Sequence, residues 1–142
     1  MALRALVSIS GKTMKRLLPG FLTESAPAVI LPVPMHRSRL RRRGYNHAVV
    51  LANRIFNRNH VCSSLLYKTR RTESQTGLSL KERKRNVRDS FGCRPLERMD
   101  RKVIIFDDVF TTGATVTAAA LAVKKAGARD IRVITLARTP LE

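Results

Sequence analysis

Hydrophobic residues fall into short apolar runs and helically spaced sets that alternate along the chain. Runs rich in apolar or β-branched residues, bounded by turn residues, are typical of strands, and four segments fit: 28–31, 63–68, 102–107 and 130–137. Apolar spacing, a capping box or an alanine-rich run before a glycine predicts helices in three segments: 45–58, 79–90 and 113–126. The predicted order is therefore β-α-β-α-β-α-β.

This order predicts the α/β class. Strands that alternate with helices form a mostly parallel sheet with right-handed crossovers and helices on its faces. Residues 1–26 are weakly patterned, so we predict an N-terminal segment, 1–26, and one folded domain, 27–142. The helix at 79–90 is too basic to be covered on all sides, and we expect it to project from the body as a hood or flap.

Residues 103–115 are the most informative segment. Four apolar residues lead into Asp107 and Asp108, and a loop of small and hydroxylated residues follows. Open α/β sheets bind ligands where their strands end, and a loop at a helix N-terminus offers N–H groups to a phosphate. A turn and a helix cap would explain a shorter match. Two adjacent carboxylates, however, repel each other unless a cation or a hydroxyl lies between them, which favours a ligand site.

This segment resembles the phosphoribosyl-pyrophosphate (PRPP) signature of type I phosphoribosyltransferases. The resemblance implies the type I phosphoribosyltransferase fold, with a flexible hood, for residues 27–142. It also implies that Asp107 and Asp108 contact the ribose hydroxyls at the catalytic centre, and that Mg²⁺ is bound mainly through PRPP rather than by a set of protein ligands. The loop that wraps the 5′-phosphate would consist of Thr111, Thr112, Gly113, Ala114 and Thr115.

A second motif joins the first predicted strand to the next helix. Five arginines crowd into it: Arg37, Arg39, Arg41, Arg42 and Arg43. Charge alone indicates a solvated basic loop or an arm that binds nucleic acid. Its place after a strand favours phosphate binding instead, because Arg makes bidentate phosphate contacts.

The residues from Pro32 to Asn46 read Pro-Val-Pro-x-His-x-x-Arg-Leu-Arg-x-Arg-Gly-Tyr-Asn, a pattern that looks like the ComF family (competence protein F and its relatives). That family usually has Gln at the next position, where this chain has His47. The resemblance covers roughly residues 28–138 and implies a pyrophosphate loop formed by Pro34, His36 and Arg37. ComF proteins commonly begin with a cysteine-rich double zinc ribbon, which this sequence lacks, so we expect no zinc site.

A third motif spans residues 70–91. Without a family to compare, it is a polar surface linker that leads into a basic helix. It matches the ComF pattern, and the resemblance implies the flexible hood that closes over PRPP and excludes water. The candidate hood residues are Arg70, Thr72, Gln75, Arg83 and Asn86.

Composition narrows the partners without choosing among them. The net charge of +18 attracts PRPP, pyrophosphate or nucleic acid alike. No apolar run approaches the roughly 20 residues that a spanning helix needs, and we expect a cytoplasmic protein without a membrane partner.

The family resemblance implies transfer of a phosphoribosyl group to a nitrogen acceptor with release of pyrophosphate, linked to competence or DNA uptake. The alternative is a non-catalytic PRPP sensor or nucleic-acid-binding regulator, with nucleic acid contacting the Arg37–Arg43 cluster. The acceptor and the oligomeric state stay open, although dimers are common in the superfamily and a homodimer would fit.

Overall fold

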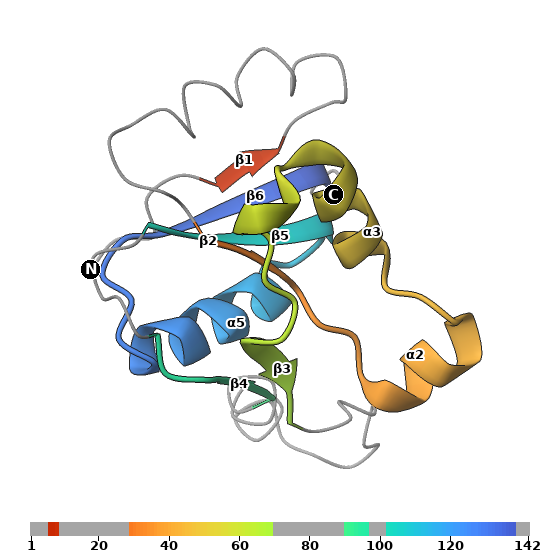
Figure 1. Ribbon diagram of the computed structural model, residues 1–142, viewed down its shortest axis with the longest axis horizontal. Coiled ribbons are helices and arrows are strands. Elements are labelled where there is room, and N and C mark those ends of the chain that lie inside the picture. Colours follow the sequence, from red (N-terminus) through yellow and green to blue (C-terminus); the bar gives the residue numbers. More distant parts are fainter. Residues whose placement is uncertain (1–5, 9–28, 70–89, 97–101, 139–142) are drawn as a thin grey trace.

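The computed structural model describes residues 6–8, 29–69, 90–96 and 102–138 (Figure 1). In this part of the chain, four parallel strands form a sheet in the order β1-β6-β5-β2. The strands are β1 (Leu6–Ser8), β2 (Val29–Pro32), β5 (Val103–Phe110) and β6 (Ile131–Arg138). Strand β1 lies in the N-terminal segment, where the sequence predicted no strand. The predicted α/β class, with a mostly parallel sheet flanked by helices, is confirmed.

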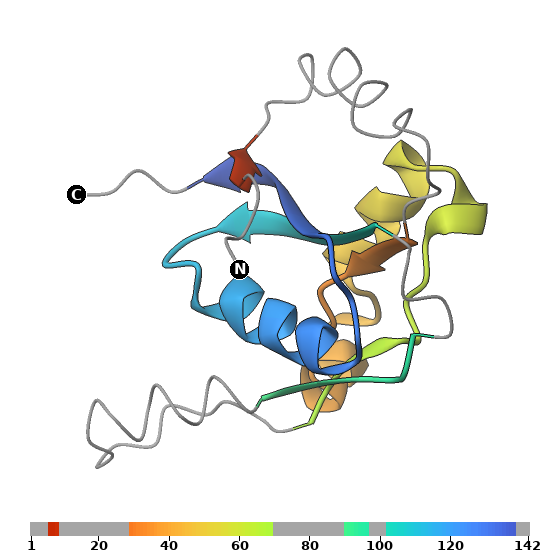
Figure 2. The same cartoon turned by 90° about the vertical axis from the view of Figure 1, so that its left-hand side faces the viewer.

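Helices cover both faces of the sheet. Helix α3 (His47–Ile55) lies on one face and α5 (Ala114–Lys125) on the other (Figure 2). The side chains of β5 alternate between these layers. Ile104 and Phe106 share a buried cluster with the small residues of α3, and Ile105 shares another with those of α5. Burying each such side chain contributes about 1.5–3 kcal/mol, so packing on both faces anchors β5 in the sheet.

A short helix, α2 (Arg37–Arg43), lies between β2 and α3, in a segment where the sequence predicted no helix. Leu40 is the only apolar residue in α2, and none of the seven residues is buried, so no hydrophobic period marks the helix. Its ends are fixed locally. His36 caps the first turn, and Gly44, at φ 80°, donates its N–H to the Leu40 carbonyl at 2.7 Å.

A two-stranded antiparallel hairpin packs beside α5. It consists of β3 (Leu66–Lys68), which is shorter than the predicted 63–68, and β4 (Phe91–Cys93), which was not predicted. The candidate hood residues between these strands lie outside the described residues. The two flanks of that segment meet, since Thr69 donates its N–H to the Ser90 carbonyl at 2.9 Å.

The predicted helix at 45–58 is also shorter in the structure. Helix α3 ends at Ile55 and is followed by a separate 3-10 turn, η1 (Arg58–His60). Among the helices that the structure describes, none has both the length and the hydropathy that crossing a bilayer requires.

Asn46 ties the turn after β2 to the start of α3. Its Nδ2 donates to the Val33 carbonyl at 2.9 Å, and its Oδ1 accepts the Ala48 N–H at 3.0 Å. A single side chain thus fixes both the exit of strand β2 and the first turn of a covering helix.

We expect Asn46→Ala to lower the free energy of unfolding by about 1.5–3 kcal/mol, since it removes a helix cap and a half-buried hydrogen bond. Urea denaturation would measure the decrease. Asn57→Ala is the matched control, because Asn57 caps only the exposed η1 turn. Equal decreases in the two variants would show that Asn46 has no special role.

Candidate ligand site at the carboxyl edge of the sheet

Asp107 and Asp108 lie inside β5 rather than after it. The sequence predicted that this strand would end at residue 107, but pairing with β6 continues to Phe110 and Arg138. Pairing with β2 stops earlier, at Pro32 and Phe106, and one further hydrogen bond joins the Val33 N–H to the Phe106 carbonyl at 2.8 Å. Among the described strands, β5 therefore has a paired neighbour on one side only beyond Phe106, and both carboxylates lie at this open edge.

Each carboxylate uses one oxygen to hold the local backbone. Asp107 Oδ1 accepts the N–H of Asp108 at 3.0 Å, and Asp108 Oδ1 accepts the N–H of Val109 at 2.9 Å. The second oxygen of Asp108 lies 3.9 Å from Nδ1 of His47, at the start of α3. The pair is held in a fixed position by its own strand, which suits the orientation of a ligand.

Burial raises the pKa of Asp107 to about 7, and the neighbouring carboxylate of Asp108 adds to the rise, while Lys68 acts in the opposite direction. Among the described residues, the charged form of Asp107 is therefore poorly compensated. A ligand that brings hydroxyl donors or a cation would stabilise it. Carboxylate oxygens are hard donors that suit Mg²⁺. Within the described residues no three His, Cys, Asp or Glu side chains group together.

The loop predicted to hold a phosphate leads from β5 into α5. Gly113 adopts φ 78° at the N-cap, has no side chain with which to cap the helix, and is followed by no acid in the first turn. Thr112 Oγ1 accepts the Ala114 N–H in a long contact of 3.5 Å. The other first-turn N–H groups can bind an anion. The other four predicted residues are exposed: Thr111, Thr112, Ala114 and Thr115.

Gly113 is required here for space as well as for its backbone angle. A Cβ at this position would lie 2.8 Å from Cζ of Phe110. The ring of Phe110 is in turn covered by the guanidinium of Arg138, whose Cζ lies 5.7 Å from the ring centroid. The chain therefore passes closely over an aromatic ring as it turns into the helix.

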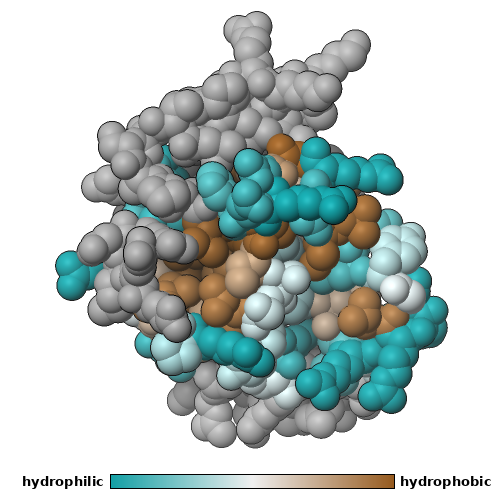
Figure 3. Space-filling model, viewed as in Figure 1, coloured by the Kyte–Doolittle hydropathy of each residue, from teal (hydrophilic) through white to brown (hydrophobic). Residues whose placement is uncertain are grey.

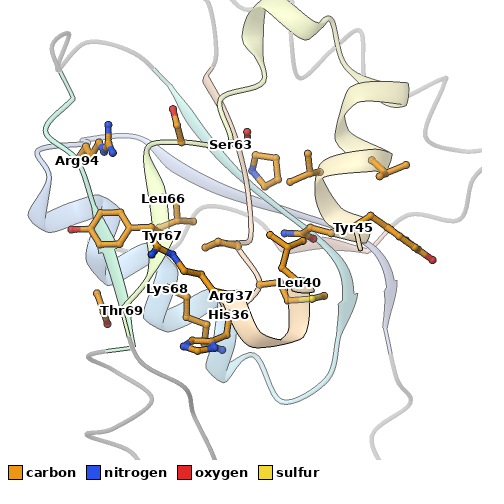
Figure 4. A pocket seen from close by; sticks show the side chains of 17 residues that line it. His36, Arg37, Leu40, Tyr45, Ser63, Leu66, Tyr67, Lys68, Thr69 and Arg94 are labelled. Carbon is orange, nitrogen blue, oxygen red and sulfur yellow. The ribbon is translucent and has the colours of Figure 1, made fainter. Parts of the chain in front are cut away.

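A groove of about 1060 Å³ opens beside this edge (Figure 4). The turn after β2, helix α2, the start of α3 and residues 63–69 form its walls. The predicted pyrophosphate residues Pro34, His36 and Arg37 all line it. His36 also caps α2, with Nδ1 accepting the Ser38 N–H at 3.3 Å and lying 2.9 Å from Ser38 Oγ. Asp107 and Asp108 do not line the groove.

The structure adds three polar residues that the sequence did not single out for this site. Lys68 lines the groove, and its pKa is lowered by burial and by Arg39, while Asp107 acts in the opposite direction. Lys68 therefore lies in the electrostatic field of the carboxylate pair. Thr135 is paired in register with Asp107, and its buried hydroxyl has no hydrogen-bond partner among the described residues. The third is His47, which lies 3.9 Å from Asp108. The only sign of it in the sequence was that the family usually has Gln at this position.

The surface around the site is mixed in character. Figure 3 shows hydrophobic side chains across the middle of one face, with hydrophilic ones toward α2. The arginines of the last turn of α2, Arg41, Arg42 and Arg43, are exposed and do not line the groove.

Comparison with known proteins finds relatives that are named for competence and for DNA utilization. No protein-family model matches the chain. Competence protein F of Haemophilus influenzae is 34% identical over 116 residues, which make up 79% of this chain and 51% of that protein. DNA utilization protein YhgH of Escherichia coli K12 is 36% identical over 115 residues, 80% of this chain and 50% of that protein. The chain thus spans about half the length of the curated relatives it matches.

We expect Asp107→Asn to be more stable than the wild type above pH 7, by roughly 1–3 kcal/mol after allowance for solvent screening. An unfolded Asp ionises near pH 4, about three units below folded Asp107. The contribution of Asp107 to stability should therefore be full below about pH 4 and be lost as the pH rises through 7, whereas Asn keeps the neutral form throughout.

Urea denaturation from pH 4 to pH 8 would measure this difference. Asp130→Asn serves as the control, because Asp130 forms an ion pair with Arg132 at 3.5 Å and gains nothing from neutralisation. A difference between the wild type and Asp107→Asn that does not vary with pH would contradict the assignment.

Proposed function

Because the chain belongs to the ComF family, we propose that it binds PRPP and transfers the phosphoribosyl group to a nitrogen acceptor, with release of pyrophosphate. The relatives are named for competence and for DNA utilization, and we extend to this chain a role in competence or DNA uptake. The architecture is compatible with a type I phosphoribosyltransferase fold, which we propose for residues 27–142.

The observation that carries the proposal is the carboxylate pair at the open edge of β5. Of the ten acidic residues in the sequence, the structure describes Asp107, Asp108 and Asp130. Two of these three are adjacent and partly buried, and the ionised form of Asp107 is disfavoured. Among the described residues, the basic side chains near the pair are His47, 3.9 Å from Asp108, and Lys68. An arrangement that costs stability is expected where a ligand supplies the missing partners.

The remaining parts of the site suit the other groups of PRPP. Asp107 and Asp108 would accept hydrogen bonds from the ribose hydroxyls. The loop from Thr111 to Thr115 would hold the 5′-phosphate through backbone N–H groups at the start of α5. Pro34, His36 and Arg37 would contact the pyrophosphate, with Arg37 as the charged group.

The proposed reaction is a displacement at the anomeric carbon of the ribose. A nitrogen of the acceptor bonds to that carbon as the bond to the pyrophosphate oxygen breaks. Pyrophosphate leaves with the electron pair, and the nitrogen gives up a proton to solvent. Mg²⁺, when bound with PRPP, would neutralise charge on the leaving group. The protein's own contribution is to orient the ribose and to hold both phosphate ends.

We expect Asp107→Asn and Asp108→Asn each to weaken Mg²⁺-dependent PRPP binding by at least about tenfold, since each loses a charged acceptor worth about 1.5–3 kcal/mol. Titration calorimetry at pH 8, where Asp107 is ionised, would measure the affinity. Asp130→Asn is the control, because Asp130 lies at the opposite end of the sheet, just before β6.

Circular dichroism should show that both variants remain folded. Unchanged affinity in both would exclude the ribose assignment. Release of pyrophosphate from PRPP in a panel of bases and amines then tests the transfer. Binding without release across the whole panel would favour the sensor alternative.

A second candidate function is nucleic-acid binding through α2. Its last turn exposes Arg41, Arg42 and Arg43, and the helix contains no acidic residue. Such a cluster neutralises phosphates whatever their sequence. It lies outside the groove, so it would not compete with PRPP for the same residues.

If α2 binds duplex DNA, replacing Arg41, Arg42 and Arg43 by Gln should reduce the slope of log K against log salt by about 0.9 for each DNA phosphate that these arginines neutralise. Fluorescence anisotropy at several salt concentrations would give the slope. A triple Gln variant at Arg54, Lys124 and Lys125, which are exposed elsewhere, controls for net charge. A flat slope for the wild type would argue against this function.

A further inference from the structure

The groove gathers most of the large hydrophobic side chains that the described surface exposes. Five such residues have high exposed fractions: Leu40 39%, Tyr45 51%, Val50 37%, Tyr67 45% and Val109 44%. The first four of them line the groove. Apolar residues gathered in a concave site are typical of a small-molecule pocket, whereas scattered ones need no explanation.

The ring of Tyr67 packs against Gly92 within this groove. It lies directly opposite Gly92 in the β3–β4 hairpin. A Cβ at Gly92 would lie 2.5 Å from Cζ of Tyr67, so the ring rests against the glycine backbone. The ring nevertheless remains 45% exposed on the groove wall. The hairpin therefore presents a pre-oriented aromatic surface, which a planar ligand could stack on at little entropic cost.

Positive charge borders the same surface. Arg37, Lys68 and Arg94 line the groove, and no described Asp or Glu does. Figure 4 shows that Arg94 and Lys68 come from the same hairpin wall as Tyr67, while Arg37 approaches from the start of α2. Lys68 is further fixed by Phe91, with its Nζ 5.2 Å from the ring centroid. An aromatic surface beside guanidinium and ammonium groups selects ligands that are both flat and negatively charged.

We propose that the groove binds a small planar anion, stacked on Tyr67 with its negative group held by Arg94. We assign this molecule as the acceptor of the phosphoribosyl group, an assignment that rests on the proposed function. The groove contains the Pro34–Arg37 turn and lies beside the edge of β5 that holds the carboxylates. The volume of about 1060 Å³ is near the upper end of ordinary small-molecule sites. The arginines that would suit a nucleic-acid polymer lie outside the groove: Arg41, Arg42 and Arg43.

Three probes separate the two properties of the ligand. Orotate is planar and anionic, uracil is planar and neutral, and succinate is anionic without a ring. Titration calorimetry in the absence of PRPP should show orotate binding at least about tenfold more tightly than either of the others, since uracil lacks the charged hydrogen bond and succinate lacks the stacking ring.

Two variants test the named contacts. We expect Tyr67→Ala and Arg94→Gln each to weaken orotate binding by about tenfold, while Tyr67→Phe keeps the ring and the affinity. Arg58→Gln is the matched control, because Arg58 is exposed and does not line the groove. Arg94 is itself exposed, so its substitution tests the contact even if Tyr67→Ala does not fold.

Several results would overturn the proposal. They are no measurable orotate binding, uracil or succinate binding as well as orotate does, and orotate binding that neither variant changes. Tyr67-dependent binding of oligothymidylate without orotate binding would assign the groove to nucleic acid instead.

Failure here is distinct from failure of the proposed function, because PRPP binding is measured separately with the Asp107 and Asp108 variants. Orotate binding without PRPP binding would leave the ligand site standing and remove the acceptor role.

Discussion

The burial of β5 is the constraint on which the other features of this structure depend. Its first four residues, Val103 to Phe106, are at most 1% exposed, between parallel neighbours on both edges and helices on both faces. Everything in the candidate site takes its position from this strand. The two carboxylates lie in its second half, and the predicted phosphate loop follows it. The turn after β2, which lines the groove, is joined to it by the hydrogen bond from the Val33 N–H to the Phe106 carbonyl.

The site also shows how a strongly basic chain keeps two carboxylates available. The nearest described cations do not neutralise Asp107. Lys68 is itself half-buried. Burial and the nearby charge of Arg39 lower its pKa, while Asp107 acts in the opposite direction. His47 reaches only Asp108, at 3.9 Å. The result, within the part of the chain that the structure describes, is an acidic pair that is held by its own strand but incompletely compensated.

Much of this arrangement could be predicted from the sequence, and the rest could not for physical reasons. The apolar runs at 102–107 and 130–137 revealed the parallel sheet, because strands buried on both faces need continuous hydrophobicity. Helix α2 was missed because it buries nothing and depends on local caps. The length of β5, the contact of Tyr67 with Gly92 and the approach of His47 to Asp108 all depend on which strands become neighbours. The hood residues lie outside the described chain, and their roles stay predictions.

Strand β6 stays paired with β5 for longer than β2 does, and this difference has a consequence for how such a protein can diversify. On one side, β6 keeps β5 in register through Arg138, which fixes the carboxylates and the approach to α5. On the other side, β2 releases the chain at Pro32, and the residues from Val33 to Tyr45 leave the sheet. Substitutions in this released turn can reshape the groove without shifting β5. One half of the site can therefore stay constant while the other half changes its ligand over evolutionary time.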